Sequence, residues 1–468
     1  TLPVIMKKTL RIYITLCFLL IAFDSFSQNS TEIKSDTLTK NIASEYFESE
    51  RKVKIFIPKN YTTKKKYPVI YTLDGYGLFH ITSSYAHYLM EYDIIPQSIV
   101  VSIYHNNRNY ETNPNYGNDI NVPVIDFLEG SEKLKNHLIK EVKPLIEEEF
   151  STSKYSVLIG HSNTATFVNE MISEKENNFN SFIAITPDLL SDQIIFLKEY
   201  LNNNKSKISY FVSSGLKDDT FRLETGKKLD TVFKNINGNF KGLFKSYDAG
   251  HLDLVPKSLN DALMFSFSEY RNFSNVHNLI LEPDFSIKKF INNIIENQSE
   301  TYGIESELNE DDFFYLSDIV AKSKNKTLVK EILDISEQNS FYPKDHLYSD
   351  KAQSYEYAGF YEDALMNWKL QIENGYHENT FYFERPFQLL TQNLNRPKEG
   401  IELLEMAIKK YPKGELTFRY LIAETILENQ LSKSKGLKNI NFCITNFRTN
   451  KKFTLEDAEE LKSRLAKK

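Results

Sequence analysis

Residues 155–165 read YSVLIGHSNTA, and this stretch decides the fold of the first half of the chain. An apolar run ends at Gly160, Ser162 follows on a tight corner, and a helical pattern begins directly after it. This order is typical of a nucleophile elbow, the strand-to-helix bend that lifts a serine hydroxyl above a parallel sheet. Glycine before the serine lets strand and helix approach each other. Thr164 stands where such elbows usually have a second glycine, so the stretch alone also fits an ordinary turn.

The composition is that of a folded chain with more than one domain. Its 468 residues are enough for two or more domains, and a hydrophobic content of 41% supplies their cores. The formal net charge of −6 is small for this length, so we expect no nucleic-acid partner. The sequence has no HExxH, paired CxxC, P-loop or GxGxxG motif, so we expect no metal, ATP or dinucleotide cofactor.

The first 27 residues are typical of a signal peptide. A basic segment at 6–11 precedes an apolar run at 12–23, and small residues at 25–27 precede Gln28. The apolar run is too short to span a bilayer, which takes ~20 residues. We therefore predict a periplasmic or secreted protein, cleaved between Ser27 and Gln28, with no membrane span in the mature chain. After cleavage Cys443 is the one remaining cysteine, which excludes an internal disulfide.

Strand and helix patterns alternate along the first half of the chain, after a polar leader at 29–40. This alternation predicts an α/β fold with a doubly wound, mostly parallel sheet, and Pro58 makes the first strand an edge strand. Ligands bind beyond the carboxyl ends of the strands in such sheets. The predicted strands are 53–58, 68–73, 98–103, 155–160, 182–185, 208–213 and 242–247, and the predicted helices are 132–150, 165–175, 194–201 and 222–233.

Three side chains with complementary chemistry, Ser162, Asp218 and His251, each follow the carboxyl end of a different predicted strand. They occur in the chain order of the α/β-hydrolase fold. Serine is a weak nucleophile and needs a base, so His251 would take its proton and later protonate the leaving group. Asp218 would hold the imidazole in the correct tautomer. Asp219 is the alternative acid; Gly215 favours Asp218 because it turns the chain back toward the sheet edge.

An oxyanion hole needs two fixed N–H donors. The backbone of Asn163, directly after the nucleophile, would supply one. The loop after the second predicted strand, with Gly75 and Tyr76, would supply the other. Asp74 in the same loop could donate through its side chain only if protonated, so we interpret it as a structural turn residue. Segments 76–92 and 104–116 are rich in tyrosine and should frame the substrate pocket.

The stretches 67–75 (YPVIYTLDG), 160–162 (GHS) and 250–251 (GH) together resemble the esterase family that includes esterase D and enterochelin-esterase-like enzymes. The resemblance covers about residues 53–271. It implies an α/β-hydrolase fold and ester hydrolysis through an acyl-serine, with Ser162 as nucleophile and His251 as base. The acid position varies in that family, and Asp218 fits it best. Thr164 departs from the family's most common motif, Gly-His-Ser-x-Gly.

From about residue 285 the patterns are helical only. Residues 352–365 have the helix–Gly–aromatic–acidic–Ala spacing of a tetratricopeptide repeat, and residues 394–401 form a weaker copy. Ala364 and Gly400 are 36 positions apart (400 − 364), close to the ~34 of that repeat. We predict a signal peptide at 1–27, an esterase domain at 28–280 and a helical domain resembling this repeat family at 281–468. An unrelated helical bundle is the alternative.

These features predict an exported serine carboxylester hydrolase that needs no cofactor and acts on a small-molecule ester. A sugar, aryl or siderophore ester fits equally well. The helical repeats would bind a protein partner or dock on the esterase domain. Two alternatives stay open, a catalytically silent α/β-hydrolase-fold interaction module and a serine peptidase of the same fold.

Overall fold

The computed structural model describes residues 37–112, 124–174, 179–375 and 377–467. The chain divides into two compact units. The first, called the α/β unit, comprises Thr1–Tyr270 and Ser299–Glu305, and the second, called the helical unit, comprises Arg271–Gln298 and Ser306–Lys468. The predicted signal peptide lies outside the described residues.

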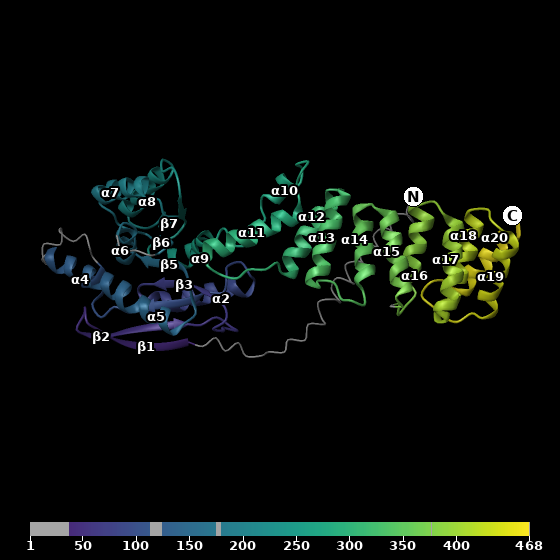
Figure 1. The fold of residues 1–468 in the computed structure, drawn as a ribbon, viewed down its shortest axis with the longest axis horizontal. Helices are drawn as coiled ribbons and strands as arrows, with labels where there is room; N and C mark the ends of the chain where they lie inside the picture. The colour runs from purple at the N-terminus through teal and green to yellow at the C-terminus, as the bar shows by residue number, and fades with distance from the viewer. Residues whose placement is uncertain (1–36, 113–123, 175–178, 376, 468) are drawn as a thin grey trace. The chain divides into compact units, whose positions relative to one another are not determined.

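A sheet with the strand order β1-β2-β4-β3-β5-β6-β7-β8 forms the centre of the α/β unit (Figure 1). β1 and β2 pair antiparallel, as do β2 and β4, and every other pair in the described sheet is parallel. The predicted α/β fold with a mostly parallel sheet is therefore confirmed. The strands are β1 (Thr37–Ser44), β2 (Ser49–Phe56), β3 (Tyr67–Thr72), β4 (Ile99–Ile103), β5 (Thr152–His161), β6 (Ser181–Ile185), β7 (Ile208–Gly215) and β8 (Phe240–Tyr247).

Two predictions at the start of the sheet are wrong. The segment 53–58 does not form the edge, because β2 lies between β1 and β4. The edge is β1, which begins at Thr37 inside the predicted leader and pairs with β2 along its whole length. Most side chains of β1 are exposed or half-buried, so the strand carries no apolar alternation that would reveal it.

Helices cover both faces of the sheet, and each face has its own core. Along β5, Leu158 points into one core, whereas Val157 and Ile159 point into the other. Strands buried on both faces are apolar throughout, which is why β3 to β6 were readable from the sequence. α2 (Gly75–Glu91) and α9 (Leu254–Ser266) lie on one face. The other helices of the unit are α3 (Arg108–Thr112), α4 (Val124–Asn136), η1 (His137–Val142), α5 (Lys143–Glu149), α6 (Asn163–Ile172), α7 (Ser191–Asn203) and α8 (Thr220–Phe233).

The helix predicted at 132–150 begins earlier than the sequence pattern indicated. Helical structure starts at Val124 and continues to Glu149 through the π-helical segment η1. The predicted apolar face is present, since Leu134, Leu138 and Val142 are fully buried in one core. The long loop predicted after residue 103 contains α3, and residues 113–123 lie outside the described part of the chain.

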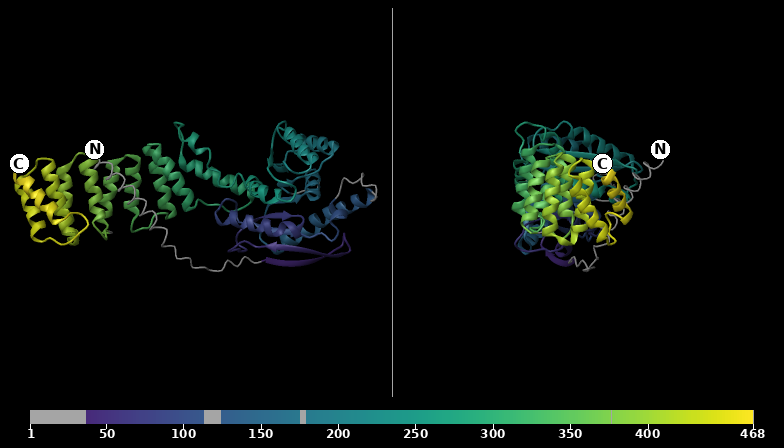
Figure 2. Two further views of the ribbon diagram at one scale, coloured as in Figure 1. Left: turned by 180° about the vertical axis from the view of Figure 1, so that it is seen from behind. Right: turned by 90° about the vertical axis from the view of Figure 1, so that its right-hand side faces the viewer.

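The helical unit contains helices only within its described residues, as predicted. Successive helices from α12 onward pack against one another, and the left view of Figure 2 shows them side by side. Gly359, whose φ of 86° is left-handed, caps the end of α14, and α15 begins at Tyr361. Whether these pairs are tetratricopeptide repeats stays a prediction. The helices are α10 (Val276–Leu279), α11 (Ile287–Tyr302), α12 (Glu310–Lys322), α13 (Lys326–Asn339), α14 (Leu347–Ala358), α15 (Tyr361–Glu373), α16 (Phe381–Gln388), η2 (Leu389–Asn393), α17 (Pro397–Lys410), η3 (Pro412–Gly414), α18 (Glu415–Glu428), α19 (Lys433–Thr445) and α20 (Leu455–Lys467), with the last residues of α11 belonging to the α/β unit.

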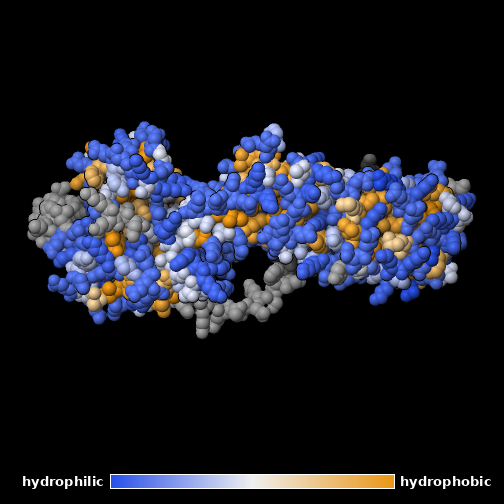
Figure 3. All heavy atoms as spheres, in the orientation of Figure 1, coloured by the Kyte–Doolittle hydropathy of each residue, from blue (hydrophilic) through white to orange (hydrophobic). Residues whose placement is uncertain are grey.

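Hydrophilic side chains cover most of the face of the helical unit seen in Figure 3. Its apolar side chains gather inside in two clusters, with Trp368 and Phe418 fully buried. No helix in the described ranges combines the length and the apolar composition needed to cross a bilayer.

Candidate active site

Ser162 lies on a sharp corner between β5 and α6. Its φ and ψ are 61° and −123°, a strained conformation for any residue other than glycine. The backbone holds it there: the Ser162 N–H donates to the Ile185 carbonyl at 2.9 Å, and the Ala165 N–H donates to the Ser162 carbonyl at 2.9 Å. The strand, strained serine and helix follow one another as the elbow interpretation of residues 155–165 requires.

Gly160 makes this corner sterically feasible. A Cβ atom at position 160 would lie 2.3 Å from the Thr164 carbonyl oxygen and 2.8 Å from the Ala165 nitrogen. Both are backbone atoms of α6, so they cannot rotate away. The first turn of the helix therefore packs directly against the end of β5.

Replacing Gly160 with alanine is expected to destabilise the α/β unit by about 2 kcal/mol or more, because overpacking against backbone forces the corner open. Urea unfolding measures the change in free energy. Gly77→Ala is the matched control, since a Cβ on Gly77, within α2, meets no atom within 4 Å. Equal stabilities for the two variants would contradict the steric explanation.

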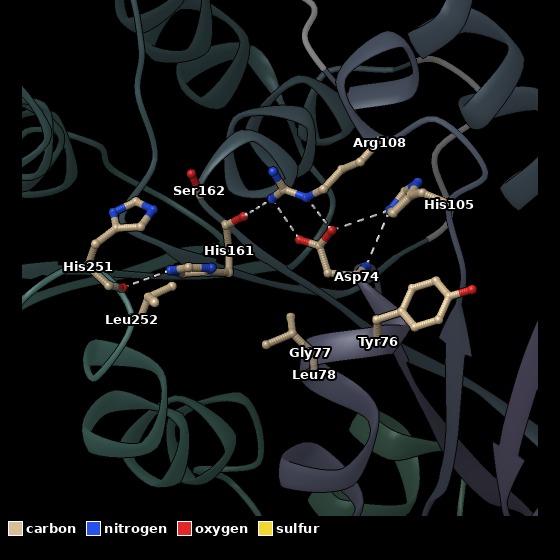
Figure 4. Close-up of a pocket in the computed structure, with 10 residues that line it drawn as sticks. All are labelled: Asp74, Tyr76, Gly77, Leu78, His105, Arg108, His161, Ser162, His251 and Leu252. Carbon is tan, nitrogen blue, oxygen red and sulfur yellow. Dashed lines mark hydrogen bonds and ion pairs between the residues drawn. The ribbon is translucent and has the colours of Figure 1, made fainter.

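A pocket of about 350 Å³ opens at the carboxyl ends of the strands, beside Ser162 (Figure 4). Its walls come from the segments after β3, β4, β5 and β8, at the sheet edge where the sequence predicted the ligand site. The lining residues are Asp74, Tyr76, Gly77, Leu78, His105, Arg108, His161, Ser162, His251 and Leu252. Among the described residues, no group of three or more His, Cys, Asp and Glu side chains is placed to hold a metal ion.

The structure places Asp218 against His251. Nδ1 of His251 lies 3.0 Å from both carboxylate oxygens of Asp218. Burial raises the pKa of Asp218, but hydrogen bonds from the Thr186 hydroxyl at 2.6 Å, the Asp219 N–H at 2.8 Å and His251 outweigh it, so the pKa is lowered. Asp218 is therefore an ionised acceptor at neutral pH. The side chain of Asp219 is exposed at the start of α8.

Ser162 and His251 both line the pocket, and Figure 4 shows their side chains on the same side of it. No hydrogen bond joins the Ser162 hydroxyl to the His251 ring in the described part of the chain. With Nδ1 turned toward Asp218, Nε2 is the ring nitrogen left for Ser162. Such contacts are often long in a site without substrate and shorten when substrate binds.

His161 supports the loop that carries His251, a role that the sequence did not suggest. Its Nε2 donates to the His251 carbonyl at 2.9 Å, and the two ring centroids are 4.8 Å apart. Burial lowers the pKa of His161 to about 4, so the ring is neutral at physiological pH. The neutral His161 ring therefore serves as a hydrogen-bond donor to the loop of His251.

Asp74 is the centre of a hydrogen-bond network between two loops. Arg108 donates to it twice, through Nε at 2.5 Å and Nη2 at 2.9 Å, and the same Nη2 donates to the His161 carbonyl at 3.0 Å. The hydroxyl of Thr164 lies 2.8 Å from Asp74 Oδ2. Burial raises the pKa of Asp74, but Arg108, His105 and Thr164 together lower it below its usual value. The side chain is therefore an ionised acceptor and cannot donate to an oxyanion.

A second layer of charged side chains lies behind His105. Nδ1 of His105 is 2.7 Å from Glu111, while Nε2 accepts the Asp74 N–H at 3.3 Å, which puts the ring proton on Nδ1. Arg51 binds the other side of the Glu111 carboxylate, at 2.9 and 2.5 Å. Both side chains of this ion pair are 1% exposed. The network thus reaches from β2 to the pocket.

Glu111→Gln is expected to lower stability more at pH 7 than at pH 3. Burial raises the pKa of Glu111, but His105 and Arg51 outweigh it and lower the pKa from 4.5 to about 2. A carboxyl group whose pKa is lower in the folded than in the unfolded state stabilises the fold at pH values above the unfolded pKa. This stabilisation is lost as the pH falls from the unfolded pKa of about 4.5 through the folded pKa of about 2. The gain is roughly 3 kcal/mol at neutral pH. Urea unfolding at both pH values measures it, and a difference between wild type and variant that does not change with pH would contradict this explanation.

The predicted oxyanion donors begin two helices. α2 starts at Gly75 and α6 at Asn163, so the N–H groups of Gly75, Tyr76 and Asn163 have no acceptor within their own helices. Tyr76 lines the pocket, and Asn163 follows Ser162 directly. A Cβ on Gly75 would lie 2.4 Å from the Tyr104 ring, so only glycine fits there.

Comparison with known proteins finds one matching family profile and several solved structures of similar fold. The sequence profile of the family described as "Putative esterase" matches residues 44–249. None of the curated proteins compared with the chain matches it.

Two solved structures share the fold, and a third has a lower similarity. An uncharacterised protein from Capnocytophaga ochracea is similar with a TM-score of 0.57 and 16% identity, over 76% of this chain and 100% of that one. An IroE-like serine hydrolase from Shewanella oneidensis has a TM-score of 0.50 and 19% identity, over 65% of this chain and 100% of that one. A siderophore hydrolase from Aspergillus nidulans has a TM-score of 0.42 and 16% identity, over 50% of this chain and 95% of that one. The profile match thus lies within the α/β unit, whose eight-stranded sheet has the fold of the first two of these structures.

Proposed function

We propose that this chain is an exported serine carboxylester hydrolase that works through an acyl-serine at Ser162. The observation that carries the proposal is the contact between Asp218 and His251 at 3.0 Å, on the same pocket as a serine held in a strained elbow. An ionised aspartate on Nδ1 keeps the proton there and leaves Nε2 as a base. A strained serine backbone and a histidine paired with an aspartate, both on one cavity, are typical of a nucleophile site.

The reaction would begin when the Ser162 hydroxyl attacks the ester carbonyl and His251 accepts its proton through Nε2. The N–H groups of Asn163 and Tyr76 would stabilise the oxyanion that forms. His251 would then protonate the departing alcohol, leaving the acyl group on Ser162. Water, activated by the same histidine, would release the acid and restore the enzyme.

The pocket supports a small ester as substrate. Its volume of about 350 Å³ is at the lower end of the range for small-molecule sites. Tyr76, Leu78 and Leu252 add apolar side chains to its lining, beside the polar side chains of the Asp74 network (Figure 4). Sugar, aryl and siderophore esters all offer an apolar part and hydrogen-bonding groups for such a pocket.

Turnover of matched substrates tests the proposal. We expect the full chain to hydrolyse p-nitrophenyl acetate and butyrate, and to leave p-nitroanilide peptides intact. Cleavage of the amides at a similar rate would favour a peptidase of the same fold. No turnover of either class would favour a catalytically silent interaction module.

Export is part of this proposal and rests on the signal-peptide pattern of residues 1–27. We expect the protein in the periplasm or medium of a bacterial host to begin at Gln28. N-terminal sequencing of the fractionated protein measures this. Uncleaved protein confined to the cytoplasm would contradict it.

A further inference from the structure

Thr164 stands at the elbow position where Gly-His-Ser-x-Gly motifs have glycine, yet the elbow forms around it. The side chain is completely buried. Its hydroxyl accepts the His161 N–H at 2.7 Å and has two acceptors within reach, Asp74 Oδ2 at 2.8 Å and the His161 carbonyl at 2.9 Å. A hydroxyl has one proton, and the carboxylate is the stronger acceptor. The Thr164 hydroxyl therefore joins the nucleophile elbow to Asp74.

Asp74 lies in the loop that carries the second proposed oxyanion donor, Tyr76. It directly precedes α2, whose first N–H groups are those of Gly75 and Tyr76, and its own φ of 55° fixes the direction of that helix start. Asp74 is 90 positions from Thr164 in sequence, so their hydrogen bond is a tertiary link between the two loops that carry the oxyanion donors. Arg108 closes the link from the opposite side, because it donates both to Asp74 and to the His161 carbonyl.

We propose that Thr164 is a positioning residue, whose hydroxyl sets the distance between the Asn163 N–H and the Tyr76 N–H through Asp74. The inference rests on the function proposed above and adds a residue to it. An oxyanion hole works only when both donors lie at hydrogen-bond distance from the same developing oxyanion. In this chain the second residue after the nucleophile holds the two donors in register, a task that glycine, without a side chain, cannot perform.

The test compares Thr164→Val, which keeps the shape but removes the hydroxyl, with Thr164→Ser, which keeps the hydroxyl. We expect Thr164→Val to lower kcat for p-nitrophenyl acetate about 10- to 100-fold, because small displacements of reacting groups have effects of this size. KM should change by less than about three-fold, because the lost interaction acts in the transition state. Thr164→Ser should restore most of kcat, and the pH profile should stay that of wild type because His251 and Asp218 are untouched.

Thr166→Val is the matched control for a lost buried hydroxyl on the same helix. Thr166 is 4% exposed, and its hydroxyl exchanges hydrogen bonds with the backbone of Asp188 at 2.9 and 3.1 Å, away from Asp74. We expect Thr166→Val to lower the melting temperature while leaving kcat unchanged. A fall in kcat as large as that of Thr164→Val would overturn the proposal.

A double-mutant cycle with Asp74→Asn tests whether Thr164 affects kcat through Asp74. If Thr164 acts through Asp74, the double variant should lose no more kcat than Asp74→Asn alone. Additive losses, wild-type kcat in Thr164→Val, or failure of Thr164→Ser to restore activity would each overturn the proposal while ester turnover by wild type stands. If wild type itself turns over no ester, the proposed function fails and this inference fails with it.

Discussion

Replacing Ser162 with alanine is expected to reduce ester turnover by a factor of about 10⁴ or more, because no other group in the pocket can form the acyl intermediate. The strained backbone at position 162 is held by hydrogen bonds that alanine keeps, from its own N–H to Ile185 and to its carbonyl from Ala165. The variant should therefore fold like wild type. Circular dichroism and melting temperature provide the control.

Initial rates with p-nitrophenyl acetate measure the loss. Ser156 and Ser173 flank the elbow in sequence, and alanine at either position should leave turnover close to wild type. Ser162→Ala with more than about a tenth of wild-type kcat would contradict the assignment, since loss of a nucleophile is far more costly.

The second large effect on kcat is expected for the triad acid, Asp218. Asp218→Asn should lower kcat about 10³- to 10⁴-fold, because an amide can stabilise the wrong imidazole tautomer and cannot stabilise the imidazolium. Asp219→Asn is the matched control one residue away. Its side chain is exposed and lies on no other group of the site, so kcat should be unchanged.

The pH dependence of kcat distinguishes a catalytic role of Asp218 from a structural one. Hydrogen bonds lower the pKa of Asp218, so the carboxylate stays ionised through the neutral range and loses its charge only in acid. Loss of activity in Asp219→Asn and not in Asp218→Asn would reverse the assignment. Equal, small losses in both would remove the aspartate from the mechanism.

Much of the α/β unit could be predicted because its signals are local. β3, β4 and β6 are buried along their whole lengths and therefore read as continuous apolar runs. β1 could not be found, because most of its side chains are exposed and it is placed mainly by its backbone ladder with β2. Backbone pairing at a sheet edge leaves little trace in side-chain pattern.

Some features of the candidate site could likewise be predicted from the sequence, and others could not. Ser162, Asp218 and His251 were readable because strand ends bring them to one edge of the sheet. The choice between Asp218 and Asp219 depends on how the turn after β7 is oriented. The structure shows that turn closed by the Asp218 N–H donating to the Gly215 carbonyl at 3.3 Å.

The Asp74 network was beyond the reach of sequence patterns. Arg108 begins the short helix α3 in a polar segment without apolar periodicity, and its partners Asp74 and His161 are 34 and 53 positions away. Thr164 appeared as a defect in a motif, because a motif records which residue is common and not what another residue could bond to. Only the tertiary structure places its hydroxyl beside Asp74.

If Ser162 is the nucleophile, a reagent that reacts covalently with activated serines should label it. The full chain would be treated with a fluorophosphonate, digested with trypsin and sequenced by mass spectrometry. The peptide of residues 155–175 contains Ser156, Ser162 and Ser173, which fragment ions distinguish. We predict one phosphonyl group on Ser162, absent from Ser162→Ala and strongly reduced in His251→Ala. Stoichiometric labelling of any other residue, or none on wild-type protein that hydrolyses esters, would contradict the account.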